Sequence, residues 1–166
     1  MNKLMNLMLA CLLIATLQAC NNEDDVIEIF TDKTWKLSRL TNEGSSEQFY
    51  AGLWNSEQER ESSWEALQQE GNFILTFNLA DVEGSVIGTC EARGIRASIS
   101  DASVTADGKD HTLSISGRIT GSETDKLASA FLNALLNVYK YEGDANSMTL
   151  YYKDGNTVRV MGFRAN

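Results

Sequence analysis

The sequence has 166 residues, a formal net charge of −9 at pH 7 and a single histidine. This length suits one domain with its own hydrophobic core. So acidic a chain has few Lys and Arg residues with which to contact nucleic acid or anionic lipid. One histidine excludes His–His zinc sites, and the sequence contains no phosphate loop or dinucleotide fingerprint. We therefore expect no nucleic-acid partner, cofactor or metal.

The N-terminus has the layout of a secretory signal peptide. Lys3 supplies a positive charge, an apolar run extends from Leu7 to Leu17, and the stretch ends at Leu17-Gln18-Ala19-Cys20. The run is about half as long as a membrane-spanning helix requires. The closing Leu-x-Ala-Cys resembles the lipobox of bacterial lipoproteins. That resemblance implies removal of residues 1–19 and attachment of a lipid to Cys20, whereas a plain signal peptide cut elsewhere is the alternative.

Residues 20–31 are predicted to form an acidic tether, because the polar run Asn21-Asn22-Glu23-Asp24-Asp25 has little to bury. Residues 32–166 then make up a single domain. Acidic residues directly behind a lipidated cysteine also resemble the surface-export signal of Bacteroidetes lipoproteins. The resemblance implies an outer-membrane lipoprotein of the cell envelope, anchored by its lipid, with display at the cell surface as a further expectation.

Short segments of alternating apolar and polar residues are typical of half-buried β-strands. The cleanest alternation places Phe73, Leu75, Phe77 and Leu79 on one face. On this basis strands are predicted over residues 34–40, 72–79, 84–89, 92–100, 113–119, 138–141, 148–152 and 157–163. Residues 49–54 are apolar and aromatic, and they fit either a further strand or a packed loop.

Two segments favour helices. Residues 56–69 are rich in helix-forming Glu and Gln, with Ser56 as a candidate N-cap, but their few apolar residues indicate a surface insertion. Residues 122–139 begin at Ser122, a second candidate cap, and change to helical spacing. Their apolar stripe consists of Leu127, Phe131, Leu135 and Val138. We expect this second helix to close one opening or face of the sheet.

The last two strands are predicted to form a hairpin. A two-residue Asp154-Gly155 loop would place Leu150 opposite Arg159. A three-residue loop, residues 153–155, places Leu150 opposite Val158 and makes the centre of one face wholly apolar. We prefer the three-residue loop, because a one-residue slip would move an apolar set to the wrong face.

These elements predict a mostly β fold (β+α), namely a small antiparallel β-barrel or curled sheet with one helix before the C-terminal hairpin and a helical insertion near residues 56–69. The motifs that carry a family resemblance are Trp35-x-Leu37, Phe73-x-Leu75-x-Phe77, Gly84-x-x-x-Gly88-x-Cys90, Phe131-Leu132-x-x-Leu135, Tyr139-x-Tyr141, Met148-x-Leu150 and Asp154-Gly155. Together they resemble the META domain of the heat-shock lipoprotein type and, more loosely, the lipocalin-like lipoproteins of Bacteroidetes. The resemblance covers residues 34–164 and implies no general enzymatic activity.

The chemistry-bearing residues are few. Of the three cysteines, Cys11 leaves with the signal peptide and Cys20 is expected to carry lipid, so Cys90 stands alone without a disulfide partner. A nucleophilic Cys90 assisted by His111 would need an orienting group, and a free Cys in a strand usually behaves as a small apolar residue. The acidic residues of the insertion, Glu57 to Glu65, are typical of a solvated helix face. We therefore expect that the protein is not an enzyme.

Aromatic residues provide the candidate binding site. Tyr50, Trp54 and Trp64, together with Phe49, gather in or near the helical insertion. They could form a stacking platform for a sugar or an apolar ligand, or they could instead anchor the insertion to the barrel. We predict a membrane-anchored protein with a non-enzymatic envelope or surface role and an unidentified small-molecule, glycan or protein partner. The alternative is a lipocalin-like carrier that holds a small apolar molecule or glycan in the barrel or on the aromatic cluster.

Overall fold

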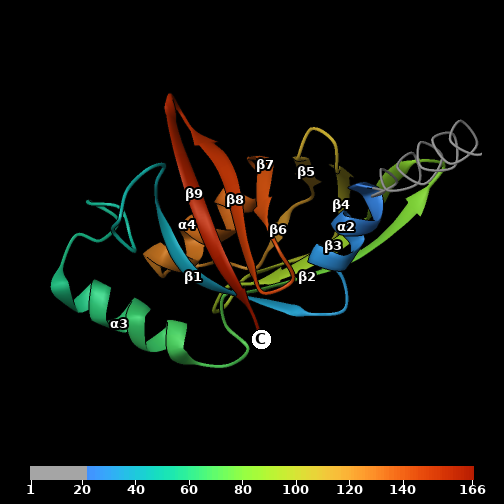
Figure 1. Cartoon of the computed structure of the whole chain (residues 1–166). Coiled ribbons are helices and arrows are strands. Elements are labelled where there is room, and N and C mark those ends of the chain that lie inside the picture. Colours follow the sequence, from blue (N-terminus) through green and yellow to red (C-terminus); the bar gives the residue numbers. More distant parts are fainter. Residues whose placement is uncertain (1–21) are drawn as a thin grey trace, which may run out of the picture.

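The computed structural model describes residues 22–166 and contains a closed antiparallel β-barrel of eight strands (Figure 1). The strands follow each other around the barrel in the order β3-β2-β1-β9-β8-β7-β5-β4, and pairing of β3 with β4 closes the ring. Their bounds are β1 Thr34–Asn42, β2 Ile74–Val82, β3 Ser85–Arg93, β4 Ser98–Asp107, β5 Thr112–Ser116, β7 Val138–Gly143, β8 Ser147–Asp154 and β9 Thr157–Ala165. An extra strand, β6 (Ile119–Thr120), pairs with the beginning of β4. The predicted mostly β, lipocalin-like barrel is confirmed.

The barrel interior is filled by side chains that alternate along the strands. The inward residues of β2 are buried in a core that also contains Trp35 and Phe163, both at most 2 % exposed. The largest fully buried side chains are Trp35, Phe30, Phe73, Phe131, Phe163, Leu40, Leu75, Ile99, Leu113, Leu127, Leu132 and Leu135. Small barrels of eight strands enclose just enough space for such side chains, so this barrel is packed through its interior.

Two helices pack at opposite ends of the barrel (Figure 1). Helix α4 (Lys126–Leu135) places Phe131 against Phe73 and Phe163, at ring-centroid distances of 6.0 and 6.2 Å. Helix α2 (Asn22–Phe30) places Phe30 against Phe77 and Tyr141, at 4.7 and 4.9 Å. The core is therefore closed from both ends. The prediction that one helix closes one opening included α4 and missed α2. Among residues 22–166, no helix is long and apolar enough to cross a membrane.

Helix α2 corrects the predicted acidic tether over residues 20–31. Val26 and Phe30 are at most 1 % exposed, and the Phe30 carbonyl accepts a hydrogen bond of 3.3 Å from the indole of Trp35. The side chain of Lys33 donates to the carbonyls of Glu28 and Ala145, which joins the end of the helix to the β7–β8 turn. The composition misled because acidic residues at the start of the segment hid a short apolar stripe. The predicted signal peptide, residues 1–19, and Cys20 lie outside the described residues.

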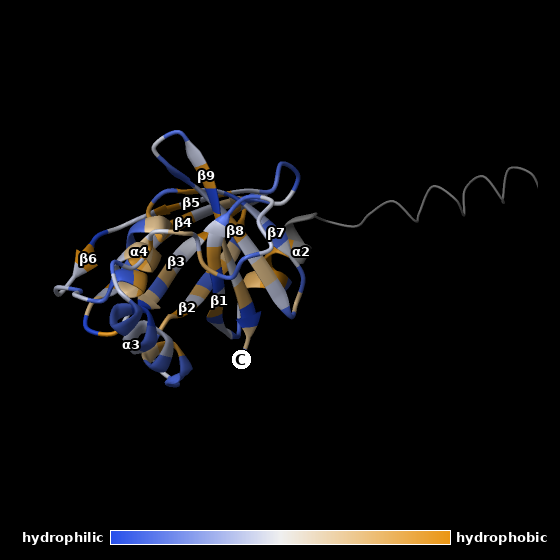
Figure 2. Cartoon of the chain, turned by 90° about the vertical axis from the view of Figure 1, so that its left-hand side faces the viewer, coloured by the Kyte–Doolittle hydropathy of each residue, from blue (hydrophilic) through white to orange (hydrophobic). Residues whose placement is uncertain are grey.

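The helical insertion is confirmed as α3 (Glu57–Gln68), with the Ser56 side chain accepting from the Glu59 backbone N–H. The second helix is shorter than the predicted residues 122–139, and its N-cap is Asp125 rather than Ser122. The aromatic segment before α3 forms a loop with an isolated bridge between Phe49 and Leu40, so of the two readings the packed loop is correct. Figure 2 shows α3 as mostly hydrophilic, as a surface helix should be.

Three strand predictions were wrong. The predicted strand 113–119 is divided between β5, which ends at Ser116, and β6, which begins at Ile119. The segment 92–100 contains the connection between β3 and β4 rather than one strand. In the last hairpin, Leu150 lies opposite Met161 and Asp154 pairs with Thr157, so the loop is Gly155-Asn156, with Gly155 at a φ of +59°. Residues 160–163 are all buried, and this two-sided burial removed the alternation from which the register was argued.

Candidate functional site

A polar hollow of about 180 Å³ lies where the β8–β9 turn, α4 and the loop before α3 meet. Tyr50 reaches it from the loop, Tyr152 from β8 and Arg159 from β9. Helix α4 and the end of β8 complete the lining with Ala130, Asn133, Ala134, Lys153 and Asp154, together with Asn137 just after α4. The hollow therefore collects two phenols, two amides and three charged groups at the α4 end of the barrel.

Arg159 is the centre of this arrangement. Its guanidinium carbon lies 3.6 Å from the centroid of the Tyr50 ring, and its Nη1 lies 2.7 Å from Oδ2 of Asp154. Tyr152 is its direct neighbour across the strand pair. The Nε atom is buried without a hydrogen-bond partner among the described residues. A cation stacked on an aromatic face and paired on one side is held in a fixed orientation.

The local backbone explains how Tyr50 comes to Arg159. The N–H of Tyr50 donates to the Leu40 carbonyl at 3.1 Å, and the N–H of Leu40 donates to Gln48 at 2.8 Å. The loop is thus fastened to β1 on both sides of Phe49. Asn133 lies on α4 and Asn137 lies just beyond its end, where the Asn137 side-chain amide donates to the Asn133 carbonyl at 2.8 Å.

Both tyrosines keep their protons at neutral pH. Burial raises the pKa of Tyr152 to about 12, with a further contribution from Tyr50 and against the opposing charge of Arg159. Burial also raises the pKa of Tyr50. Protonated phenols donate hydrogen bonds, so they suit a ligand that presents acceptor oxygens. With Lys153 and Arg159 against Asp154, the charged residues sum to one positive charge in a chain that is acidic overall.

The predicted aromatic residues do not form one platform. Phe49 meets Trp54 and Trp64 edge-to-face, at ring-centroid distances of 5.2 and 5.6 Å, whereas Tyr50 belongs to the hollow. The indole of Trp54 donates to the fully buried hydroxyl of Ser63 at 2.8 Å. Trp64 is 38 % exposed. Trp54 therefore anchors α3. The sequence analysis did not identify Arg159 and Tyr152 as site residues. The one feature that could have indicated them is that a basic and an aromatic residue face each other across the last hairpin.

Glu123, just before α4, occupies a ring of backbone donors. Its Oε2 accepts from the N–H groups of Ile95, Arg96 and Ala97 at 3.0, 2.9 and 3.3 Å, and its Oε1 accepts from Thr124 and Asp125 at 3.1 and 3.3 Å. Partial burial acts to raise its pKa, but the backbone hydrogen bonds outweigh it and hold the pKa below its ordinary value. This carboxylate fills the position that an anionic ligand would otherwise take, so its role is structural.

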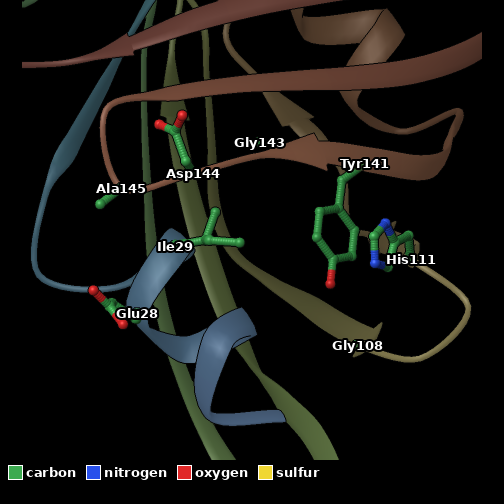
Figure 3. A pocket seen from close by; sticks show the side chains of 8 residues that line it. All are labelled: Glu28, Ile29, Gly108, His111, Tyr141, Gly143, Asp144 and Ala145. Atoms are coloured by element: carbon green, nitrogen blue, oxygen red, sulfur yellow. The ribbon is translucent and has the colours of Figure 1, made fainter. Parts of the chain in front are cut away.

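Cys90 is a buried residue of β3, and His111 lies exposed at the β4–β5 turn. Cys90 is 2 % exposed, and burial, followed by the charge of Glu91, raises its pKa to about 12. His111 stacks on Tyr141, with ring centroids 5.5 Å apart, beside a hollow of about 350 Å³ that α2 and two strand turns line (Figure 3). In Figure 3 the His111 and Tyr141 rings lie together on one side, with Asp144 and Glu28 on the other.

The acidic residues of α3 behave as the sequence predicted. Glu57 pairs with Arg60 on an exposed helix face, and Glu59 accepts from the Asn55 N–H at 2.8 Å. Among residues 22–166, no group of three or more His, Cys, Asp or Glu residues could hold a metal ion.

Comparisons with known proteins identify the family. Residues 21–165 match the family model described as a domain of unknown function, DUF4847. A crystal structure of a DUF4847 family protein from Bacteroides vulgatus ATCC 8482 is 24 % identical, with a TM-score of 0.56 over 85 % of this chain and 97 % of that one, and it shows the shared fold. No curated protein matches the chain. The predicted relationship to the META domain was wrong, because the shared motifs are those of many small barrels. With nearly its whole described length matched, the chain belongs to the DUF4847 family.

Proposed function

We propose that this protein is a non-enzymatic lipoprotein of the cell envelope, anchored at the outer membrane through Cys20, whose barrel binds a small polar ligand. The anchor is supported by the Leu17-Gln18-Ala19-Cys20 stretch at the end of the apolar run.

The observation that carries the binding role is the stacking of Arg159 on Tyr50 inside a half-open hollow. A fixed guanidinium, two protonated phenols and two amides together recognise carboxylate and hydroxyl oxygens. The volume of about 180 Å³ is smaller than pockets for drug-sized molecules, so the ligand, or its end group, is about the size of one ring. A sugar acid satisfies both the size and the chemistry.

The filled interior favours this external hollow over the carrier alternative. Trp35, Phe73 and Phe131 are fully buried inside the barrel and take the space where a lipocalin-like carrier would hold an apolar molecule. The burial of Cys90, with its raised pKa, supports the non-enzymatic character, because its thiolate is the form that attacks.

The anchor is tested by Cys20→Ala in the full-length chain. We expect the variant to lose incorporation of radiolabelled palmitate and to leave the membrane fraction, whereas Cys90→Ala stays there with its label. Retention of both label and membrane association by Cys20→Ala would overturn the anchor.

Ligand binding is tested by calorimetric titration of the detergent-solubilised protein with glucuronate, galacturonate and glucose. We expect binding of an uronate and at least a roughly tenfold weaker affinity in Arg159→Gln, because a charge-assisted bidentate contact is lost. Arg118→Gln is the matched control, since it removes the same charge from an exposed position outside the hollow. Absence of binding by all three sugars, or equal weakening in both variants, would refute the assignment of the hollow.

A further inference from the structure

The β2–β3 hairpin ends in an apolar outward face. Val82 and Ile87 are 47 % and 40 % exposed, high values for large apolar side chains in a structure with a filled core. Ala80 pairs with Ile87, and Val82 pairs with Ser85, so all four residues lie on one face of the hairpin. We call residues 80–87 the hairpin tip.

The strand positions on the outward face of the hairpin tip, Ala80, Val82, Ser85 and Ile87, carry no charge. Thr105 is the β4 neighbour of Ile87 and continues the uncharged surface. Asp81 pairs with buried Val86 and thus belongs to the other face, where its Oδ1 accepts from the Gly84 N–H at 2.9 Å. The four strand residues of this face are therefore uncharged, and the remaining acidic residue of the tip, Glu83, is exposed in the turn.

The hairpin tip lies at the end of the barrel from which the chain leads toward Cys20. Helix α2 contacts β2, β3 and β4, and Thr31 bridges to Phe77 in the middle of β2. Figure 1 shows α2 lying alongside the hairpin, with α3 and α4 at the far end of the molecule. The apolar tip and α2 thus lie at the same end, while the Arg159 hollow beside α4 lies at the far end.

The segment from Phe30 back to Cys20 and the segment of β2 from Phe77 to Val82 have similar lengths. Measured from the Phe30–Phe77 contact, α2 extends about 13 Å to Asn22, and the residues back to Cys20 add at most roughly 7 Å. Along β2, the distance from Phe77 to Val82 is about 17 Å. A bilayer that holds the lipid of Cys20 is therefore within reach of the hairpin tip.

We infer that the hairpin tip is a second membrane contact, in which Val82 and Ile87 rest in the interface of the bilayer that holds the Cys20 lipid. The inference depends on the proposed anchor. Weak apolar contacts become effective beside a lipid because the lipid already holds them at the membrane, and a second contact fixes the tilt of the domain. The barrel then stands with α2 toward the membrane and the Arg159 hollow away from it.

The test uses the lipidated full-length chain in phosphatidylcholine vesicles, with Cys90→Ala as background and an environment-sensitive fluorophore on Ile87→Cys. The matched control carries the same fluorophore on Glu65→Cys, an exposed position of α3. Quenching by spin-labelled lipids should be about threefold or more stronger at position 87 than at position 65. Ser85→Cys provides a second probe on the same face, and Val82→Asp should reduce the quenching at position 87.

The outcomes separate the contact from the anchor. Equal quenching at positions 87 and 65 in protein that floats with the vesicles overturns the membrane contact and leaves the anchor intact. Failure of the protein to float overturns the anchor. A blue shift at position 87 that appears without vesicles and grows with protein concentration assigns the face to a second copy of the chain, which also overturns the membrane contact.

Discussion

The hydroxyl of Ser63 donates a hydrogen bond of 2.6 Å to Oδ2 of Asp125, a residue 62 positions later in the chain, and this bond joins α3 to the start of α4. Asp125 also caps α4 by accepting from the Ala128 N–H at 2.8 Å. With Trp54 donating to Ser63, a continuous chain of hydrogen bonds connects the insertion to the helix that closes the barrel.

Ser63→Ala should destabilise the protein by about 1–3 kcal/mol, because it leaves the Trp54 indole without its acceptor and Asp125 without one donor in a buried site. Urea unfolding followed by tryptophan fluorescence measures the change. Ser62→Ala, at an exposed neighbouring position of α3, should change the free energy of unfolding by less than about 0.5 kcal/mol. Equal effects of the two substitutions would show that the hydrogen bonds of Ser63 do not contribute to the free energy of unfolding.

Glu123 makes part of the stability dependent on pH. The pKa of Glu123 in the folded state lies below its ordinary value of 4.5. Its contribution to the free energy of unfolding is therefore fully present above pH 4.5 and is lost as the pH falls through the folded-state pKa. Glu123→Gln should cost about 1 kcal/mol at pH 7, since the carboxylate is still partly solvated, and should flatten the acid side of the stability curve. Unfolding midpoints between pH 7 and pH 3 test this, with exposed Glu65→Gln as control. Parallel curves for wild type and Glu123→Gln would contradict it.

Gly88 is required by close packing of two strands. A Cβ at this position would lie within 3 Å of the backbone of Leu79 and also collide with the Asn78 carbonyl oxygen. Gly88→Ala should therefore cost about 1–3 kcal/mol or prevent folding. Gly71→Ala adds the same methyl group where no atom lies within 4 Å, and its thermal midpoint should stay close to that of wild type. Similar melting of Gly88→Ala and wild type would show that β2 can move aside.

Phe30 tests whether α2 belongs to the core. Phe30→Ala should cost about 3–5 kcal/mol, because it removes a fully buried ring that contacts Phe77 and Tyr141. Glu28→Ala, at an exposed position two residues away on α2, should change stability by less than about 0.5 kcal/mol. Denaturant unfolding measures the change. A small decrease in the free energy of unfolding for Phe30→Ala would indicate that residues 20–31 act as a tether and not as part of the core.

Cys90 should react with thiol reagents only after unfolding. With its pKa raised to about 12 by burial, it has little thiolate at pH 8, and alkylation should be roughly a thousandfold slower than in the unfolded chain. Iodoacetamide labelling followed by mass spectrometry gives both rates. Rapid labelling of the native protein, at a rate that follows a pKa near neutrality, would reopen a catalytic role.

Local signals predicted local structure well. Ser56 was identified as a cap because the N-cap hydrogen bond involves residues close in sequence. The register of the last hairpin failed because burial of Val160 through Phe163 depends on segments that are distant in the chain. Separation in the chain also explains why the site was only partly predicted. Tyr50 was identified as an aromatic residue, but its partner Arg159 lies more than a hundred residues away.

Strand β1 pairs with β9 along residues 35–42 and 159–165, so the first strand of the barrel meets the last. The ring cannot close until the final residues of the chain have been synthesised, whatever hairpins have formed before. During synthesis the polypeptide therefore contains no closed barrel until β9 is complete. Under the proposed export to the cell envelope, this connectivity keeps the barrel from closing before the last strand, β9, is present.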